Sequence, residues 1–239
     1  MRGRVAGATL LALLLPQGAG AQLQEEDVEV PVSRQTAEEG AREAQAAEEA
    51  APEALEPTAA EAPLGAWREV AAPEDVDRIE DNERAYGAAL DLARRAGTDA
   101  DRAELGRILA DLPQPIDRAA LPGRWDCRTV RFIEDPADFR VYGWFPCQIS
   151  ELPQGLLLEK LGGSELTAGY LYPESETRMI YLGYAHGQSE PARDYPGAAG
   201  PAERRDAAIL TQRGPDRLLL AKPDPLGDAD YDFLEFRRR

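Results

Sequence analysis

The feature that most constrains the fold is the second half of the chain, where short β-prone segments alternate with turn-forming residues. Short connections favour antiparallel pairing of consecutive strands, and eight strands are enough to close a small barrel without exposed edges. We therefore expect residues 123–239 to form an antiparallel eight-stranded β-barrel. The expected strands are residues 124–133, 139–150, 156–161, 167–172, 179–185, 207–211, 218–222 and 231–236.

Residues 65–122, ahead of the strands, carry a helical pattern. Pro73 suits the first position of a helix, and Gly97 suits the residue that ends it. Thr98 is the expected N-cap of a second helix that runs to Leu112. The apolar face of the first helix consists of Val76, Ile79, Tyr86, Leu90 and Ala93. The fold class is therefore mainly β with an N-terminal helical hairpin, which we expect to pack on the outer wall of the barrel or across one end.

The N-terminus has the pattern of a secretory signal peptide over residues 1–21. Arg2 and Arg4 precede a short apolar stretch at 8–15, and small residues lead to an expected cleavage after Ala21. An uncleaved anchor is the alternative. No apolar run reaches the roughly 18 residues of a membrane span, so no transmembrane segment is expected after cleavage. These features predict a secreted protein.

Most of the negative charge lies in residues 22–64, which contain twelve Asp and Glu side chains against two Arg, a net charge of −10 out of −17. This Ala-, Glu- and Pro-rich segment has no aromatic residue, so we expect it to be disordered. It is a spacer or, alternatively, an acidic tether or cation-binding tail. The acidic chain as a whole disfavours nucleic acid as a partner.

The two cysteines, Cys127 and Cys147, fall on consecutive predicted strands of a chain that is expected to be secreted. An oxidising compartment favours a disulfide between them, because a hairpin can bring the two strands together. A reactive thiol pair or two metal ligands are the alternatives, although the spacing is not that of a C-x-x-C motif.

We find no catalytic constellation in the sequence, and we expect no cofactor and no enzymatic activity. His186, the single histidine, has no recognisable nucleophile partner, so a structural role is expected for it. Gly162 and Gly163 predict a turn and not a phosphate-binding loop. Acidic residues are too abundant for any pair of carboxylates to indicate a glycosidase.

A ligand pocket inside the barrel is a speculative possibility. Glu159 and Lys160 are adjacent in one predicted strand, so one of them faces inward and could place a charge near the barrel interior; a charge at the rim or on the surface is the alternative. Trp125, Tyr170 and Tyr181 are candidates for the lining of such a pocket, and the alternative is that they belong to the core.

Several short motifs resemble a family of secreted proteins of Gram-negative bacteria catalogued as domain of unknown function 4893. They are Trp67-Arg68, Asp77-Arg78-Ile79, Gly123-Arg124-Trp125-Asp126-Cys127-Arg128, Tyr142-Gly143-Trp144-Phe145-Pro146-Cys147, Glu159-Lys160-Leu161-Gly162-Gly163-Ser164, Tyr181-Leu182-Gly183 and Glu235. The resemblance spans residues 67–236 and implies a compartment and a domain extent, but no catalytic residues. The Gly-x-Trp of the first strand and the meander of eight strands are also similar in architecture to calycins such as lipocalins.

Together these features predict a non-enzymatic secreted or periplasmic protein that binds a small molecule or an envelope partner. A hydrolase acting on envelope material and a structural module with a filled barrel are the alternatives. The observation that separates these functions is whether the barrel contains a cavity, and which charges line it.

Overall fold

The computed structural model describes residues 63–225 and 229–239. The predicted signal peptide and nearly all of the acidic segment lie outside the described residues. The helices are α2 (Trp67–Val70), α3 (Pro73–Glu80), α4 (Asn82–Arg95), α5 (Asp99–Ile108), η1 (Arg118–Ala120) and η2 (Ala202–Arg204). The strands are β1 (Gly123–Ile133), β2 (Asp138–Val141), β3 (Phe145–Leu152), β4 (Gly155–Lys160), β5 (Glu165–Pro173), β6 (Met179–Gly187), β7 (Arg205–Gly214), β8 (Arg217–Pro223) and β9 (Tyr231–Arg238).

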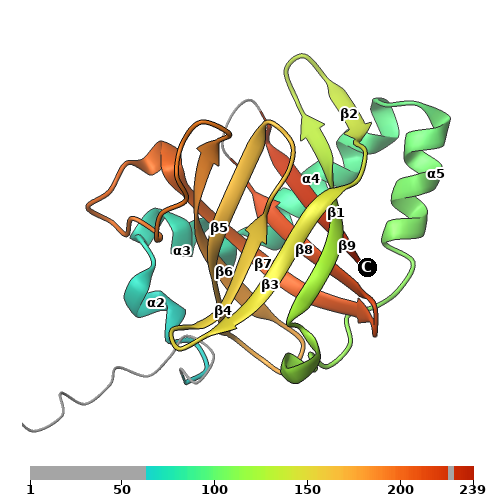
Figure 1. Cartoon of the computed structure of the whole chain (residues 1–239). Helices are drawn as coiled ribbons and strands as arrows, with labels where there is room; N and C mark the ends of the chain where they lie inside the picture. The colour runs from blue at the N-terminus through green and yellow to red at the C-terminus, as the bar shows by residue number, and fades with distance from the viewer. Residues whose placement is uncertain (1–62, 226–228) are drawn as a thin grey trace, which may run out of the picture. The chain divides into compact units, whose positions relative to one another are not determined.

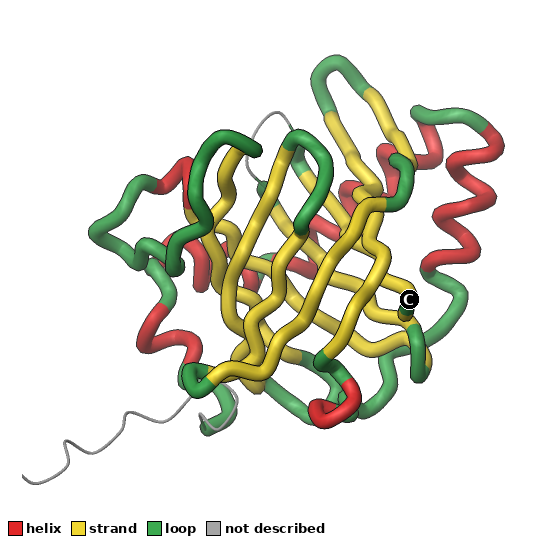
Figure 2. The backbone as a smooth tube through the Cα atoms, viewed as in Figure 1, coloured by secondary structure: helices red, strands yellow, loops and turns green. Residues whose placement is uncertain are grey.

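The strands form one antiparallel sheet that closes on itself, because β1 pairs with both β3 and β9. Eight strands, β1 and β3 to β9, make the closed ring, and β2 extends from it as a hairpin with the far end of β1 (Figure 1). The predicted mainly β fold with an antiparallel eight-stranded barrel is therefore confirmed. Figure 2 shows the helices lying outside the ring of strands.

The structure divides the single predicted strand 139–150 into β2 and β3, so that prediction was wrong at residues 142–144. The reason is the length of β1, whose last residues pair with β2 while its first residues, Gly123 to Cys127, pair with β3. The chain must leave β1 between these two pairings. Pro146 is the second residue of β3, and the register with β1 runs through it without a shift.

The predicted helix 73–97 is likewise two helices, which separate at Asp81. The side chain of Ile79 in α3 packs with Trp67 against the outer face of β6 and β7, whereas Leu92 in α4 packs against β1, β8 and β9. One straight helix cannot follow both parts of a curved wall. Thr98 caps α5 as predicted, through a capping box with Asp101, but α5 ends at Ile108 and not at Leu112.

The segment between α5 and β1 crosses one end of the barrel. Gln114 pairs with Gln212 at the end of β7, and the backbone N–H of Ile116 donates to the carbonyl of Glu176 between β5 and β6. Leu121 and Trp125 then close the interior at this end, where the indole N–H of Trp125 donates to the carbonyl of Leu121 at 3.0 Å. The helices thus cover the part of the outer wall formed by β1 and β6 to β9, and the linker that follows them covers one end.

Candidate functional site

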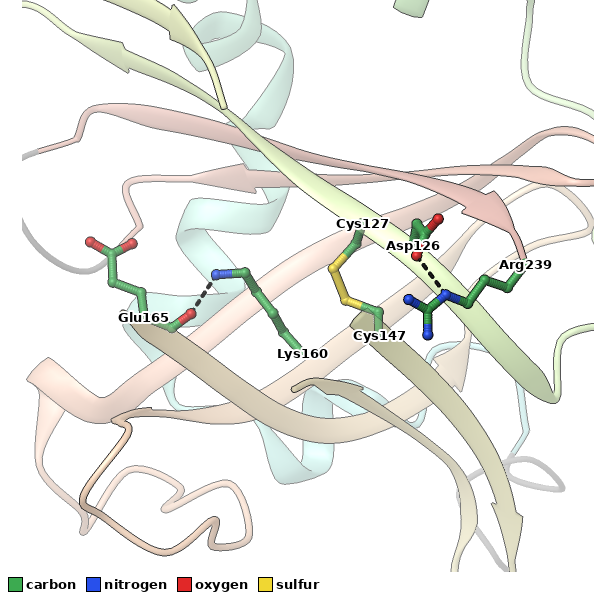
Figure 3. The surroundings of a disulfide bond; sticks show 6 residues. All are labelled: Asp126, Cys127, Cys147, Lys160, Glu165 and Arg239. Atoms are coloured by element: carbon green, nitrogen blue, oxygen red, sulfur yellow. Dashed lines mark hydrogen bonds and ion pairs between the residues drawn. A yellow bond between two sulfur atoms is a disulfide. The ribbon is translucent and has the colours of Figure 1, made fainter. Parts of the chain in front are cut away.

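The interior of the barrel is divided into an apolar half and a polar half. The apolar half, next to the covered end, is filled by buried side chains that include Trp125, Leu158, Leu220 and Phe236. The disulfide between Cys127 and Cys147 belongs to this half, with a Cα–Cα distance of 5.8 Å, and it bridges β1 and β3 (Figure 3). The predicted disulfide is therefore confirmed, and it lies inside the barrel.

The polar half is a ring of charged and hydroxyl side chains, each from a different strand. Strand register brings them together, because Lys160 is opposite Thr167, and Asp232 is opposite both Arg131 and Lys222. The ring consists of Arg131, Lys160, Thr167, Asp206, Lys222 and Asp232. These residues line a pocket of about 250 Å³, which we call the barrel-end pocket. Its rim includes Ser164, His186 and Arg204.

One side of the barrel-end pocket is a hydrogen-bonded chain centred on Asp206, whose residue is 2 % exposed. The carboxylate of Asp206 accepts from the ammonium of Lys222 and from the hydroxyl of Thr167, both at 2.7 Å. The Thr167 oxygen also lies 2.5 Å from the phenol oxygen of Tyr181. Burial, together with the nearby charge of Asp206, raises the pKa of Tyr181 well above its usual value, so its phenol stays protonated.

The other side of the pocket is centred on Arg131. Its guanidinium donates to Asp232 at 3.1 and 2.9 Å and to Glu165 at 2.9 and 2.5 Å. Burial raises the pKa of Asp232 to about 6, against the opposing effect of the hydrogen bonds from Arg131. Glu165 is more open to solvent, and the Arg131 contact lowers the pKa of its carboxyl group.

Lys160 differs from these paired groups. Its residue is 8 % exposed, and its Nζ donates to the backbone carbonyl of Glu165 (Figure 3). The Nζ also lies 5.5 Å from the centre of the Phe145 ring. Within residues 63–225 and 229–239, no carboxylate lies within ion-pair distance of this ammonium. Burial, and then repulsion from Lys222, lowers the pKa of Lys160, and the more distant carboxylates of Glu165 and Asp232 offset this only in part.

The predicted pocket residues fall in three different places. Lys160 lines the barrel-end pocket, and Tyr181 belongs to the buried interior cluster next to it, within hydrogen-bond distance of Thr167. Trp125 is buried in the apolar half, at the covered end. Glu159 and Tyr170 alternate with the inward-facing Leu158, Lys160 and Leu171, so they belong to the outer face of the barrel.

Sequence reasoning missed Lys222, Asp206 and Asp232. One signal for Lys222 was present, because the chain contains only two lysines among its 27 basic residues, and the other 25 are arginines. Both lysines line the barrel-end pocket. His186 lies at the rim, where its Nδ1 is 3.1 Å from the carbonyl oxygen of Gly187 and its ring stacks on Tyr184.

A search of the described part of the chain for three or more clustered His, Cys, Asp or Glu side chains finds no candidate metal site. None of the helices in that same part combines the length and the apolar character needed to cross a membrane.

The closed barrel, with helices on its wall and a charged pocket at one end, defines the architectural class of this protein. The chain belongs to the family described as a domain of unknown function, DUF4893, whose model matches residues 67–236. Among solved structures, a redesigned β-barrel has 14% sequence identity and covers 53% of this chain and 99% of its own, with a TM-score of 0.34. No curated protein matches the chain.

Proposed function

We propose that this chain is a periplasmic or secreted binding protein, and that its barrel-end pocket takes a small organic anion whose carboxylate contacts Lys160. The observation that carries this proposal is the buried Lys160 ammonium, which lines the pocket without a carboxylate partner among the described residues. A buried charge without a counter-ion is costly, and a bound anion would remove that cost.

The size of the barrel-end pocket supports a ligand with few heavy atoms. Its volume of about 250 Å³ lies just below the range of roughly 300 to 1,000 Å³ that holds drug-sized ligands. The apolar half of the barrel is filled, so a long lipid chain has no room beneath the polar ring. Small hydroxy acids and keto acids are therefore the molecules that suit the pocket.

Two features support the proposed compartment. The first 21 residues have the order of basic, apolar and small residues that is typical of a signal peptide. The disulfide is compatible with an oxidising compartment.

The proposal is tested with glycolate as the probe, by saturation-transfer NMR on the purified protein. We expect a transfer signal at millimolar glycolate with the unmodified chain, and loss of that signal in Lys160→Met. Glu159→Gln is the matched control, because Glu159 is the neighbouring residue on the outer face and its change should leave the signal intact. No signal with the unmodified chain, or an equal signal in Lys160→Met, would contradict the proposed function.

A further inference from the structure

The distribution of lysine and arginine is the starting point. The chain uses arginine at 25 of its 27 basic positions, in ion pairs, cation–π contacts and exposed sites alike. Its two lysines, Lys160 and Lys222, are in separate strands but line the same pocket. Arginine stays protonated in proteins, whereas lysine can lose its proton when it is buried or next to other cations. The pocket therefore holds all the side-chain amines of a chain that otherwise relies on arginine.

The two amines have different surroundings. Lys222 donates to the carboxylate of Asp206 at 2.7 Å, so it has a buried counter-ion. Lys160 has a backbone carbonyl and the face of Phe145 as its neighbours. Burial and the positive charges of Lys222 and Arg131 lower its pKa, against the opposing effect of the carboxylates of Glu165 and Asp232, neither of which is within ion-pair distance. Burial beside further cations is the environment that activates lysine as a nucleophile.

The backbone next to Lys160 leaves room for a reacting molecule. Gly163 has a φ of +94°, and a Cβ at this position would lie 3.1 Å from the Nζ of Lys160. The glycine therefore leaves the space next to the amine free of a side chain, in the turn that joins β4 to β5. The amine of Lys160 therefore has open space beside it for a reacting molecule.

We propose that Lys160 captures a small aldehyde or α-keto acid in the barrel-end pocket as a covalent imine. The proposal rests on the proposed function, since it names the class of molecule that occupies the same pocket. The Nζ lone pair attacks the carbonyl carbon, and a C–N bond forms to give a carbinolamine. The carbonyl oxygen then leaves as water with the two protons of the neutral amine, and a C=N bond remains. The step is reversible and needs no oxidant, reductant or further reactant.

The experiment uses glyoxylate, the aldehyde analogue of glycolate, with cyanoborohydride to reduce any imine to a stable secondary amine. Intact-mass measurement should show one carboxymethyl group per chain, and peptide mapping should place it on Lys160. We expect most of the label on Lys160 and little on Lys222, because burial lowers the pKa of Lys160 and so leaves more of its amine neutral, whereas Lys222 is held in an ion pair with Asp206. Lys222→Arg should keep the label, and Lys160→Arg should lose it.

Mapping of the unmodified chain decides the question even if a variant fails to fold. Label divided equally between Lys160, Lys222 and the α-amino group would overturn the proposal, as would label retained in Lys160→Arg. If glycolate gives its NMR signal while glyoxylate leaves no label on Lys160, imine capture is wrong and the proposed anion binding stands. If glycolate gives no NMR signal and glyoxylate leaves no label on Lys160, both proposals are wrong.

Discussion

Cys147 and Lys160 face each other across the β3–β4 pairing, so the disulfide and the buried amine are neighbours inside the barrel. Cys147 is covalently linked to Cys127 on β1, which fixes the strand next to the one that carries Lys160. The bridge therefore stabilises the boundary between the filled apolar half and the barrel-end pocket.

Loss of this bridge should be visible in thermal unfolding. A disulfide that closes a loop of about 20 residues contributes roughly 3 kcal/mol to stability. We expect the Cys127→Ala/Cys147→Ala double variant to melt roughly 6–12 °C lower than the unmodified chain, at the 2–4 °C per kcal/mol typical of a domain of this size. An unchanged melting temperature in the double variant would refute the stabilising role of the bridge. Free thiols in the unmodified protein, detected by mass spectrometry, would show that the bridge does not form.

Lys160→Met should make the protein more stable, because it replaces a buried cation with an apolar side chain of similar length. Groups kept for binding commonly reduce stability, and their removal gains about 0.5–2 kcal/mol. Chemical denaturation should show a higher midpoint for Lys160→Met. Lys222→Met is the matched comparison, and it should lower the midpoint, because it leaves the buried carboxylate of Asp206 without its cation. A lower midpoint for Lys160→Met than for Lys222→Met would show that Lys160 has a structural role.

Glu235, on the outer face of β9, should be a major contributor to stability. Its carboxylate is 3 % exposed and accepts from Arg128 of β1 at 2.7 Å and from Arg107 of α5 at 2.9 Å. Glu235→Ala leaves the buried guanidinium of Arg128 with Glu104 as its remaining ion-pair partner among the described residues, so we expect a loss of about 1.5–3 kcal/mol. Urea unfolding should show this loss. A loss as small as that of Asp126→Asn, which removes a more exposed partner of Arg237, would contradict it.

Acid should weaken the contact between α5 and the barrel through Glu104. Hydrogen bonds from Arg107, and then from Arg128, lower the pKa of Glu104 to about 2, from 4.5 in the unfolded chain. Because the pKa is lower in the folded protein, the contribution of the Glu104 carboxylate to stability is fully present above pH 4.5 and is lost as the pH falls towards 2. After allowance for solvent screening we expect about 1 kcal/mol. The free energy of unfolding of Glu104→Gln, measured by urea denaturation, should therefore be lower than that of the unmodified chain at pH 6, and the two values should converge near pH 2.

Gly163→Ala should reduce both stability and access to Lys160. The positive φ of Gly163 disfavours any other residue by about 1–2 kcal/mol, and the new methyl group would stand 3.1 Å from the Lys160 Nζ. We expect a lower melting temperature and slower labelling of Lys160 by glyoxylate. Gly187→Ala is the control at the pocket rim, because a Cβ there meets no atom within 4 Å. Equal labelling rates in the two variants would show that Gly163 does not control access.

The closed barrel and the disulfide were predictable because they depend on local patterns. Alternation and turn residues mark the strands, and Cys127 and Cys147 fall on consecutive ones. The break at residues 142–144 was not predictable, since it arises from the two partners that β1 meets along its length. The separation of α3 from α4 at Asp81 has a similar origin, in the curvature of a wall that assembles only in the folded protein.

The candidate site was predictable only in part. The alternation of Glu159 and Lys160 required that one of them face inward, and the structure shows that it is Lys160. Tyr170 and Leu171 could not be assigned to a face in the same way, since both faces of β5 carry large side chains. Lys222 and Asp206 meet through pairings between β7, β8 and β9 that no local pattern encodes.

The covered end of the barrel also determines how a ligand would travel. Because the linker with Ile116 and Leu121 closes the apolar end, the barrel-end pocket is a blind chamber and not a channel. A molecule that enters past Ser164, His186 and Arg204 at the rim must leave through the same opening of the pocket. Arrival and departure then pass the same barrier, so a change at the rim should alter residence time and capture rate together and leave the equilibrium occupancy nearly constant.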